Sequence, residues 1–213
     1  MRLIAHITSW ILHPLLFPTY GLLLILLLLP GRYGYFGDKL HVVWLILVVA
    51  LTFVFPAVWL LMMKQLAMIQ NLELPTNKER IIPFVAVITF YLWSAWMFKP
   101  AANMKIPPDE NIFLMLSGAS ISAFIAFFIN VFTKISLHAL GAGNLVALFI
   151  LLTRLADYDL RMALPVIILL AGLTGTARLL LNAHTPAQVY SGYLAGFTGQ
   201  FIAFTILPIT GII

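Results

Sequence analysis

Long apolar runs, interrupted by short polar segments, dominate this chain. Hydrophobic residues make up 62% of the 213 positions and charged residues only 9%, whereas soluble domains carry about 25% charged residues. A helix needs about 20 apolar residues to cross the hydrocarbon core of a bilayer, and several runs meet or approach that length. The runs are continuous rather than alternating, so they favour helices over a membrane β-barrel. The sequence therefore predicts an all-α, polytopic helical bundle in a membrane.

Seven apolar segments are expected to form this bundle, as one domain over residues 1–213. They cover residues 10–29, 40–63, 82–98, 112–132, 141–153, 162–181 and 189–207. The third and fifth are short, so the expectation is six to seven transmembrane helices. His13-Pro14 and Pro18 predict a kinked or half-interfacial start of the first segment, because proline breaks the helical hydrogen-bond ladder. Gly192, Gly196 and Gly199 predict a face of the last segment that packs closely against other helices.

Three polar islands interrupt the apolar pattern, at residues 78–83, 134–143 and 177–192. They follow the second, fourth and sixth segments. If every segment crosses, all three islands lie on the same side of the membrane and can share one site. Basic residues number six on each side, so the positive-inside rule does not tell which side this is. Five of the seven acids lie opposite the islands, which suits an anionic headgroup at the site.

The residue types in the islands fit phosphoryl transfer without a metal. Such a reaction needs a nucleophile, a proton donor for the leaving oxygen, and cations around the phosphate. His184 and His138 are candidates for the first two roles. Arg178 offers permanently charged, bidentate contacts to phosphate. The further candidate phosphate ligands are Ser136, at the expected start of a helix, Lys78 and Arg80.

The second and third islands resemble the motifs of the type 2 phosphatidic acid phosphatase superfamily of membrane lipid phosphatases. Arg178, five residues and then His184 match the R-x5-H part of its third motif, and Ser136-Leu-His138-Ala stands where that family has S-G-H-A. The motif region covers about residues 78–199. The resemblance implies that His184 attacks phosphorus to form a phosphohistidine and that His138 is the acid/base. It also implies that Arg178 and Ser136 bind phosphate.

The chain departs from the family pattern at several positions. Gln188 stands where the family has an aspartate four residues after the nucleophile. A glutamine carbonyl can accept the Nδ1–H of His184 and fix its tautomer, but it adds no negative charge. In the first motif, Glu73 occupies the position of the family lysine, and Pro83 follows Arg80 by three residues instead of one.

The predicted function is an integral membrane lipid-phosphate phosphatase acting on a lipid phosphomonoester or diphosphate, with no cofactor and no metal. Phosphatidate, phosphatidylglycerophosphate and polyprenyl diphosphate are all candidate substrates. Two alternatives stay open: a catalytically impaired lipid-phosphate binding or assembly protein, and a phosphotransferase that uses the same site. The expected location is a bacterial inner (cytoplasmic) membrane. The net charge of +5 comes from dispersed basic residues, which indicate membrane contact and no nucleic-acid partner.

For a further group of ionisable residues the sequence predicts structural roles. Asp157 and Asp159 lie between Arg154 and Arg161, a pattern that favours a salt-bridged turn over a metal site. His6, His13 and His41 have no partner that the sequence identifies, so we expect interfacial structural roles for them.

Overall fold

The structure is a computed structural model that describes residues 1–34, 36–71, 74, 76–100, 109–155 and 158–208. These residues form helices and connecting turns, with no strand among them. The all-α prediction is thus confirmed for the described part of the chain. The helices are α1 (Arg2–Ile11), α2 (Phe17–Leu28), α3 (Pro30–Tyr33), α4 (Lys39–Val49), α5 (Phe55–Gln65), α6 (Ile81–Met97), α7 (Glu110–Phe132), α8 (Leu137–Leu155), α9 (Leu164–Leu180) and α10 (Pro186–Ile206).

Several helices have the length and polarity of membrane spans. Among the described residues, Arg2–Leu28, Lys39–Gln65, α7 and α8 are long and apolar enough to cross a bilayer, and α6 and α9 are shorter apolar helices. These helices indicate a membrane protein, while the count of six to seven crossings stays a prediction. The predicted bounds of the fifth segment, residues 141–153, were wrong. Helix α8 already begins at Leu137 and spans 19 residues.

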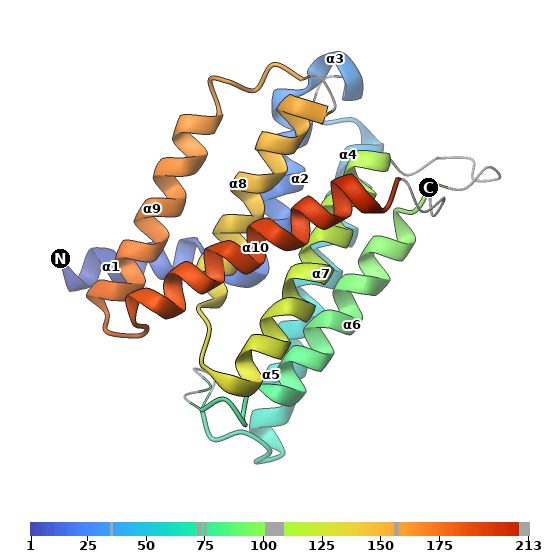
Figure 1. The fold of residues 1–213 in the computed structure, drawn as a ribbon. Helices are drawn as coiled ribbons and strands as arrows, with labels where there is room; N and C mark the ends of the chain where they lie inside the picture. The colour runs from blue at the N-terminus through green and yellow to red at the C-terminus, as the bar shows by residue number, and fades with distance from the viewer. Residues whose placement is uncertain (35, 72–73, 75, 101–108, 156–157, 209–213) are drawn as a thin grey trace.

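A break at His13-Pro14 separates the first two helices. Pro14 opens a single 3₁₀ turn, and the chain changes direction between α1 and α2. Figure 1 shows α1 running crosswise to α8, near the ends of α8 and α9 that lie away from α3. One face of α1 buries Ala5 and Ser9. The side chains on the other face are exposed: Leu3, Ile4, Ile7, Trp10 and Ile11. The predicted kink is confirmed, and it directs the small side of α1 toward the protein.

Helix α4 continues into α5 through five π-helical residues, Ala50–Val54. Pro56 follows this segment directly. Proline has no N–H to donate to the preceding turn, so the helix ladder shifts its register there. The helix stays continuous over Lys39–Gln65.

Helix α10 crosses over α7 and α8 (Figure 1) and touches both closely. A Cβ placed on Gly192 would meet the Ser136 carbonyl oxygen at 2.6 Å, and one on Gly196 would meet the Leu140 carbonyl oxygen at 2.0 Å. Glycine is required at these positions because backbone of α8 occupies the space of a side chain. The predicted packing face of the last segment is confirmed, and it fixes the start of α10 against the start of α8.

The opposite end of the bundle carries ion pairs. Arg32 Nη2 lies 2.8 Å from Asp109 Oδ2, and the Asp109 carboxylate also accepts the first N–H groups of α7. Asp159 and Arg161 form an ion pair at 2.9 Å, which confirms the salt-bridged turn for that acid. Asp157 lies outside the described residues.

Candidate active site at one end of the bundle

The connection between α9 and α10 forms the centre of the site. Asn182 adopts a left-handed conformation with φ of 51° and turns the chain back after α9. Thr185 then caps α10, with Pro186 as its first residue. In this capping box the Thr185 hydroxyl accepts the N–H of Gln188, and the Gln188 side chain accepts the N–H of Thr185 at 3.3 Å. His184 thereby directly precedes the capped start of α10, where it is half-buried.

Gln188 also contacts the candidate nucleophile. Its Oε1 lies 3.0 Å from Nδ1 of His184. Because the N–H of Thr185 needs an acceptor, the amide oxygen rather than the amide nitrogen must face this corner. An amide oxygen only accepts, so Nδ1 of His184 carries the proton and donates it. The neutral ring then keeps its lone pair on Nε2, the atom required for attack on phosphorus.

The charges of three cations act on His184. Burial, together with the charges of Lys134, Arg80 and Arg178, lowers the pKa of His184 to about 4, against the opposing hydrogen bond to Gln188. The imidazole is therefore neutral at pH 7. Neutral histidine beside positive charge is a suitable combination for a nucleophile that attacks an anion, because the cations attract the phosphate while the lone pair stays available.

The cations reach this position from different segments. Arg178 lies in the last turn of α9. Lys134, between α7 and α8, directs Nζ to the Ala183 carbonyl oxygen at 3.4 Å. Arg80 is only 6% exposed and donates to the carbonyl oxygens of Leu74 and Ile135, at 2.9 and 3.0 Å. Burial and the charge of Arg178 lower the pKa of Arg80 to about 10, so Arg80 remains charged at neutral pH.

The second candidate histidine lies in the first turn of α8. Nε2 of His138 is 3.1 Å from the backbone carbonyl oxygen of Ser9 in α1. The hydroxyl of Ser9 accepts from Nη1 of Arg178 at 3.2 Å. The ring of His13 stands edge-on to that of His138, with centroids 6.1 Å apart. The start of α8 and the end of α9 thus meet at the N-terminal segment.

Two predicted phosphate ligands have other surroundings. Ser136 is fully buried, and its hydroxyl accepts the N–H of Ala139 at 3.4 Å, as a residue that caps α8 does. Its own N–H donates to the Gln188 carbonyl oxygen at 3.1 Å, which ties α8 to α10. Lys78 is exposed in the turn before α6 and takes no part in the hydrogen bonds of the cluster described above. Arg80 is therefore the residue of the first island that reaches the other two.

Sequence reasoning missed three residues of this cluster. Lys134 belongs to the second island, but the sequence pattern gives it no role of its own, and no pattern points to Ser9. For His13 the sequence predicts an interfacial structural role, and in the structure its ring lies against that of His138. The available signal was a histidine followed by proline inside an apolar run, which marked a break in the helix without indicating what the break would face.

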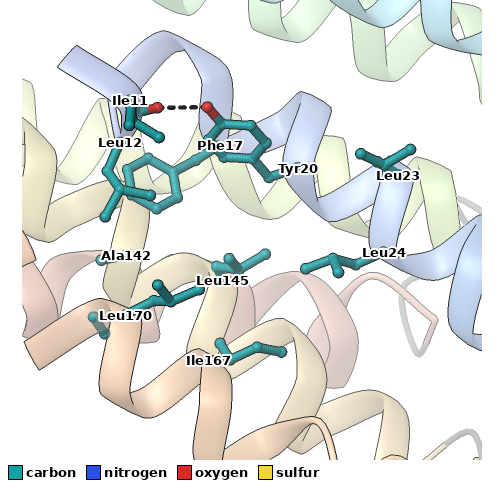
Figure 2. A pocket seen from close by; sticks show the side chains of 11 residues that line it. Ile11, Leu12, Phe17, Tyr20, Leu23, Leu24, Ala142, Leu145, Ile167 and Leu170 are labelled. Carbon is teal, nitrogen blue, oxygen red and sulfur yellow. Dashed lines mark hydrogen bonds between the residues drawn. The ribbon is translucent and has the colours of Figure 1, made fainter. Parts of the chain in front are cut away.

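An apolar cavity of about 300 Å³ lies between helices that also carry residues of the polar cluster. Figure 2 shows the cavity between the α1–α2 segment and helices α8 and α9. Ile11 and Leu12 line it directly after Ser9 in the chain, and Ala142 lines it one turn after His138. The hydroxyl of Tyr20, another lining residue, donates to the Ile11 carbonyl oxygen. The mostly apolar walls of the cavity can therefore contact the hydrocarbon part of a ligand.

Comparison of the chain with protein-family models, with curated proteins and with solved structures found no match.

Proposed function

We propose that this protein is an integral membrane phosphatase that removes phosphate from a lipid phosphomonoester or diphosphate, as a divergent member of the type 2 phosphatidic acid phosphatase superfamily. The observation that carries the proposal is the setting of His184. Its Nδ1 is hydrogen-bonded to Gln188 at 3.0 Å, which leaves Nε2 unprotonated, and the charges of Lys134, Arg80 and Arg178 act on the ring. A structural histidine does not require three cations around it, whereas a nucleophile for a phosphate ester does.

The reaction proceeds in two steps under this proposal. Nε2 of His184 attacks phosphorus, the bond from phosphorus to the lipid oxygen breaks, and His138, which takes up a proton on Nδ1 when the anionic phosphate binds, gives that proton to the lipid oxygen. Water then attacks the phosphohistidine and passes a proton to His138, while the N–P bond breaks and releases inorganic phosphate. Arg178, Arg80 and Lys134 stabilise the charge on the phosphate oxygens in both steps.

The apolar cavity supports a lipid as the substrate. It is lined by hydrocarbon from α1, α2, α8 and α9 (Figure 2), the helices α1, α8 and α9 also carrying Ser9, His138 and Arg178. A phosphate held by Arg178 would leave its chain next to this cavity, within the apolar layer of the membrane. Under this proposal six to seven of the apolar segments cross the bilayer, and the site lies at one surface of a bacterial inner membrane.

The absence of a charge on Gln188 favours a second candidate function, the binding of lipid phosphates without turnover. A glutamine orients His184 without stabilising the positive ring that develops when a phosphoryl group is bound. A protein of this kind that has lost turnover would bind lipid phosphates as an assembly or carrier protein. An alcohol in place of water in the second step would instead give a phosphotransferase.

The test is phosphate release by purified protein in detergent with EDTA, over a panel of lipid monophosphates and diphosphates. His184→Ala is compared with His6→Ala, which alters an exposed histidine of α1. We expect release by the wild type and by His6→Ala, and a loss of at least about 10³-fold in His184→Ala, because the covalent route is gone. A folded, fully active His184→Ala variant would refute the mechanism. A silent wild type that still binds lipid phosphates would support the binding protein.

A further inference from the structure

Ser9 links two residues of the candidate site that belong to different helices. Its hydroxyl accepts from Nη1 of Arg178 in α9 at 3.2 Å. Its backbone carbonyl oxygen lies 3.1 Å from Nε2 of His138 in α8. Ser9 is only 8% exposed, so water competes little for either contact. A single residue of α1 therefore touches both the candidate phosphate ligand and the candidate acid/base.

The contact with the carbonyl determines the tautomer of His138. A carbonyl oxygen only accepts hydrogen bonds, so Nε2 of His138 must carry a proton. In the neutral ring the lone pair then lies on Nδ1, which becomes the atom that exchanges a proton. His184 has the opposite arrangement, because its Nδ1 donates to Gln188. The two histidines are thus set in opposite tautomers by two different acceptors.

The contact with the hydroxyl restrains Arg178. A guanidinium on a long side chain loses conformational freedom when it binds phosphate, and a partner that holds it beforehand reduces that loss. Ser9 supplies such a partner from a buried position on α1. The outer face of α1 exposes apolar side chains such as Ile7 and Trp10, which keeps the helix against the apolar layer and Ser9 facing inward.

We propose that Ser9 is a positioning residue of the phosphate site, whose hydroxyl aims Arg178 and whose carbonyl orients His138 with Nδ1 as the proton-exchanging atom. This inference rests on the proposed function for the roles of Arg178 and His138. It extends the site to α1, outside the motif region of residues 78–199.

The first experiment measures turnover and orthovanadate binding in Ser9→Ala, with Thr8→Val as the matched control on the neighbouring position of α1. Orthovanadate imitates phosphate and reports the anion site without requiring turnover. We expect Ser9→Ala to weaken vanadate binding and to lower kcat/KM by about five- to tenfold, the range expected for one hydrogen bond. Thr8→Val should change neither value by more than about twofold.

A double-mutant cycle tests whether Ser9 acts through Arg178. Arg178→Lys should lower vanadate affinity much less in the Ser9→Ala background than in the wild type. In that background the hydroxyl that orients the guanidinium of Arg178 is already absent. The positioning role would be overturned if Arg178→Lys lowered vanadate affinity by the same factor in both backgrounds. It would also be overturned if Ser9→Ala bound vanadate as tightly as the wild type.

A nitrogen-15 spectrum of histidine-labelled protein at neutral pH tests the carbonyl contact. The expected result is a proton on Nε2 for neutral His138 and on Nδ1 for His184. A proton on Nδ1 of neutral His138 would contradict the assignment. A wild type that binds vanadate but releases no phosphate would refute the phosphatase alone, and one that binds no vanadate would refute both proposals.

Discussion

The side-chain oxygen of Gln188 lies 3.0 Å from Nδ1 of His184 and also accepts the N–H of Thr185. One amide thus caps helix α10 and sets the tautomer of the candidate nucleophile. The third helical position of a capping box favours Glu or Gln, whose side chain is long enough to reach back to the capping residue. This geometry gives a physical reason for a glutamine at a position where the resembled family has the shorter aspartate.

Gln188→Glu should raise turnover. Glutamate keeps the length of the side chain and both acceptor contacts, and it adds a negative charge that stabilises the imidazolium and suits the start of a helix. We expect a higher pKa for His184 and a kcat increased by up to about tenfold. Gln188→Asp should raise kcat by a smaller factor, because the shorter aspartate side chain loses the contact with the N–H of Thr185. Gln188→Leu should lower kcat by about 10²–10⁴-fold, because no acceptor then fixes the tautomer of His184. Equal activity of the Glu and Leu variants would contradict this role.

Activity should persist into acid. The proposed nucleophile is neutral His184. Its pKa is lowered from 6.5 to about 4, so the acidic limb of the kcat/KM profile that His184 causes should lie near pH 4. Lys134→Met removes one of the charges that lower this pKa and should move the limb to higher pH. Lys99→Met, at the far end of α6, is the control and should leave the limb in place. A wild-type limb at pH 6.5 that Lys134→Met does not move would contradict the electrostatic account.

The same pKa shift affects stability. The unfolded chain protonates His184 near pH 6.5, whereas the folded protein does so only near pH 4. The unfolded state therefore binds more protons between these values, and the contribution of His184 to the free energy of unfolding falls as the pH drops from 6.5 to about 4. In His184→Gln this part of the pH dependence should vanish, as measured by thermal unfolding in detergent. An unchanged pH dependence would mean that His184 is not responsible.

Gly196→Ala should destabilise the bundle. The added methyl group would meet the backbone of α8, with the Leu140 carbonyl oxygen at 2.0 Å, and overpacking of this kind costs about 1–3 kcal/mol. Gly172→Ala is the matched control, because nothing lies within 4 Å of a Cβ at that position of α9. It should stabilise the helix by about 0.5–1 kcal/mol. Similar unfolding temperatures for the two variants would refute the close approach of α10 to α8.

Filling the apolar cavity should affect long-chain substrates selectively. Leu170 lines the cavity, and its neighbour Leu169 is 62% exposed on another face of α9. Leu170→Trp is expected to raise KM for long-chain lipid phosphates while leaving hydrolysis of short-chain phosphates unchanged. Leu169→Trp should leave both unchanged. Equal effects of Leu170→Trp on short and long chains would show that the cavity does not hold the hydrocarbon chain.

Local patterns predicted much of the site. Arg178, His184 and Gln188 lie within eleven residues of the α9–α10 connection, so their spacing already determined that they would be neighbours. The alternation of the apolar segments predicted that the three islands lie on one side of the membrane, where they can share one site. The structure brings residues of all three together: Arg80 with Ile135, and Ser136 with Gln188. It does not bring Lys78 into these contacts.

The N-terminal contribution was not predictable in this way. Ser9 and His13 lie more than 120 residues from His138 in the chain, and nothing in their immediate neighbours indicates a partner at that distance. Their contacts depend on the angle between α1 and α2 after Pro14, and on the way α1 packs against α9. A sequence pattern reports the break at His13-Pro14 but not the direction that the chain takes afterwards.

The sequence by itself determined the all-helical architecture of the described residues, the apolar character of the helices, the break at His13-Pro14 and the closely packed glycine face of the last segment. These follow from the length of the apolar runs and from proline and glycine positions, all of which act within a few residues. Only the tertiary structure decided that Ser9, His13 and Lys134 join the site and that Ser136 is buried as a cap. Such contacts arise from the packing of helices distant in the chain, where small shifts in crossing angle or rotation decide which side chains meet.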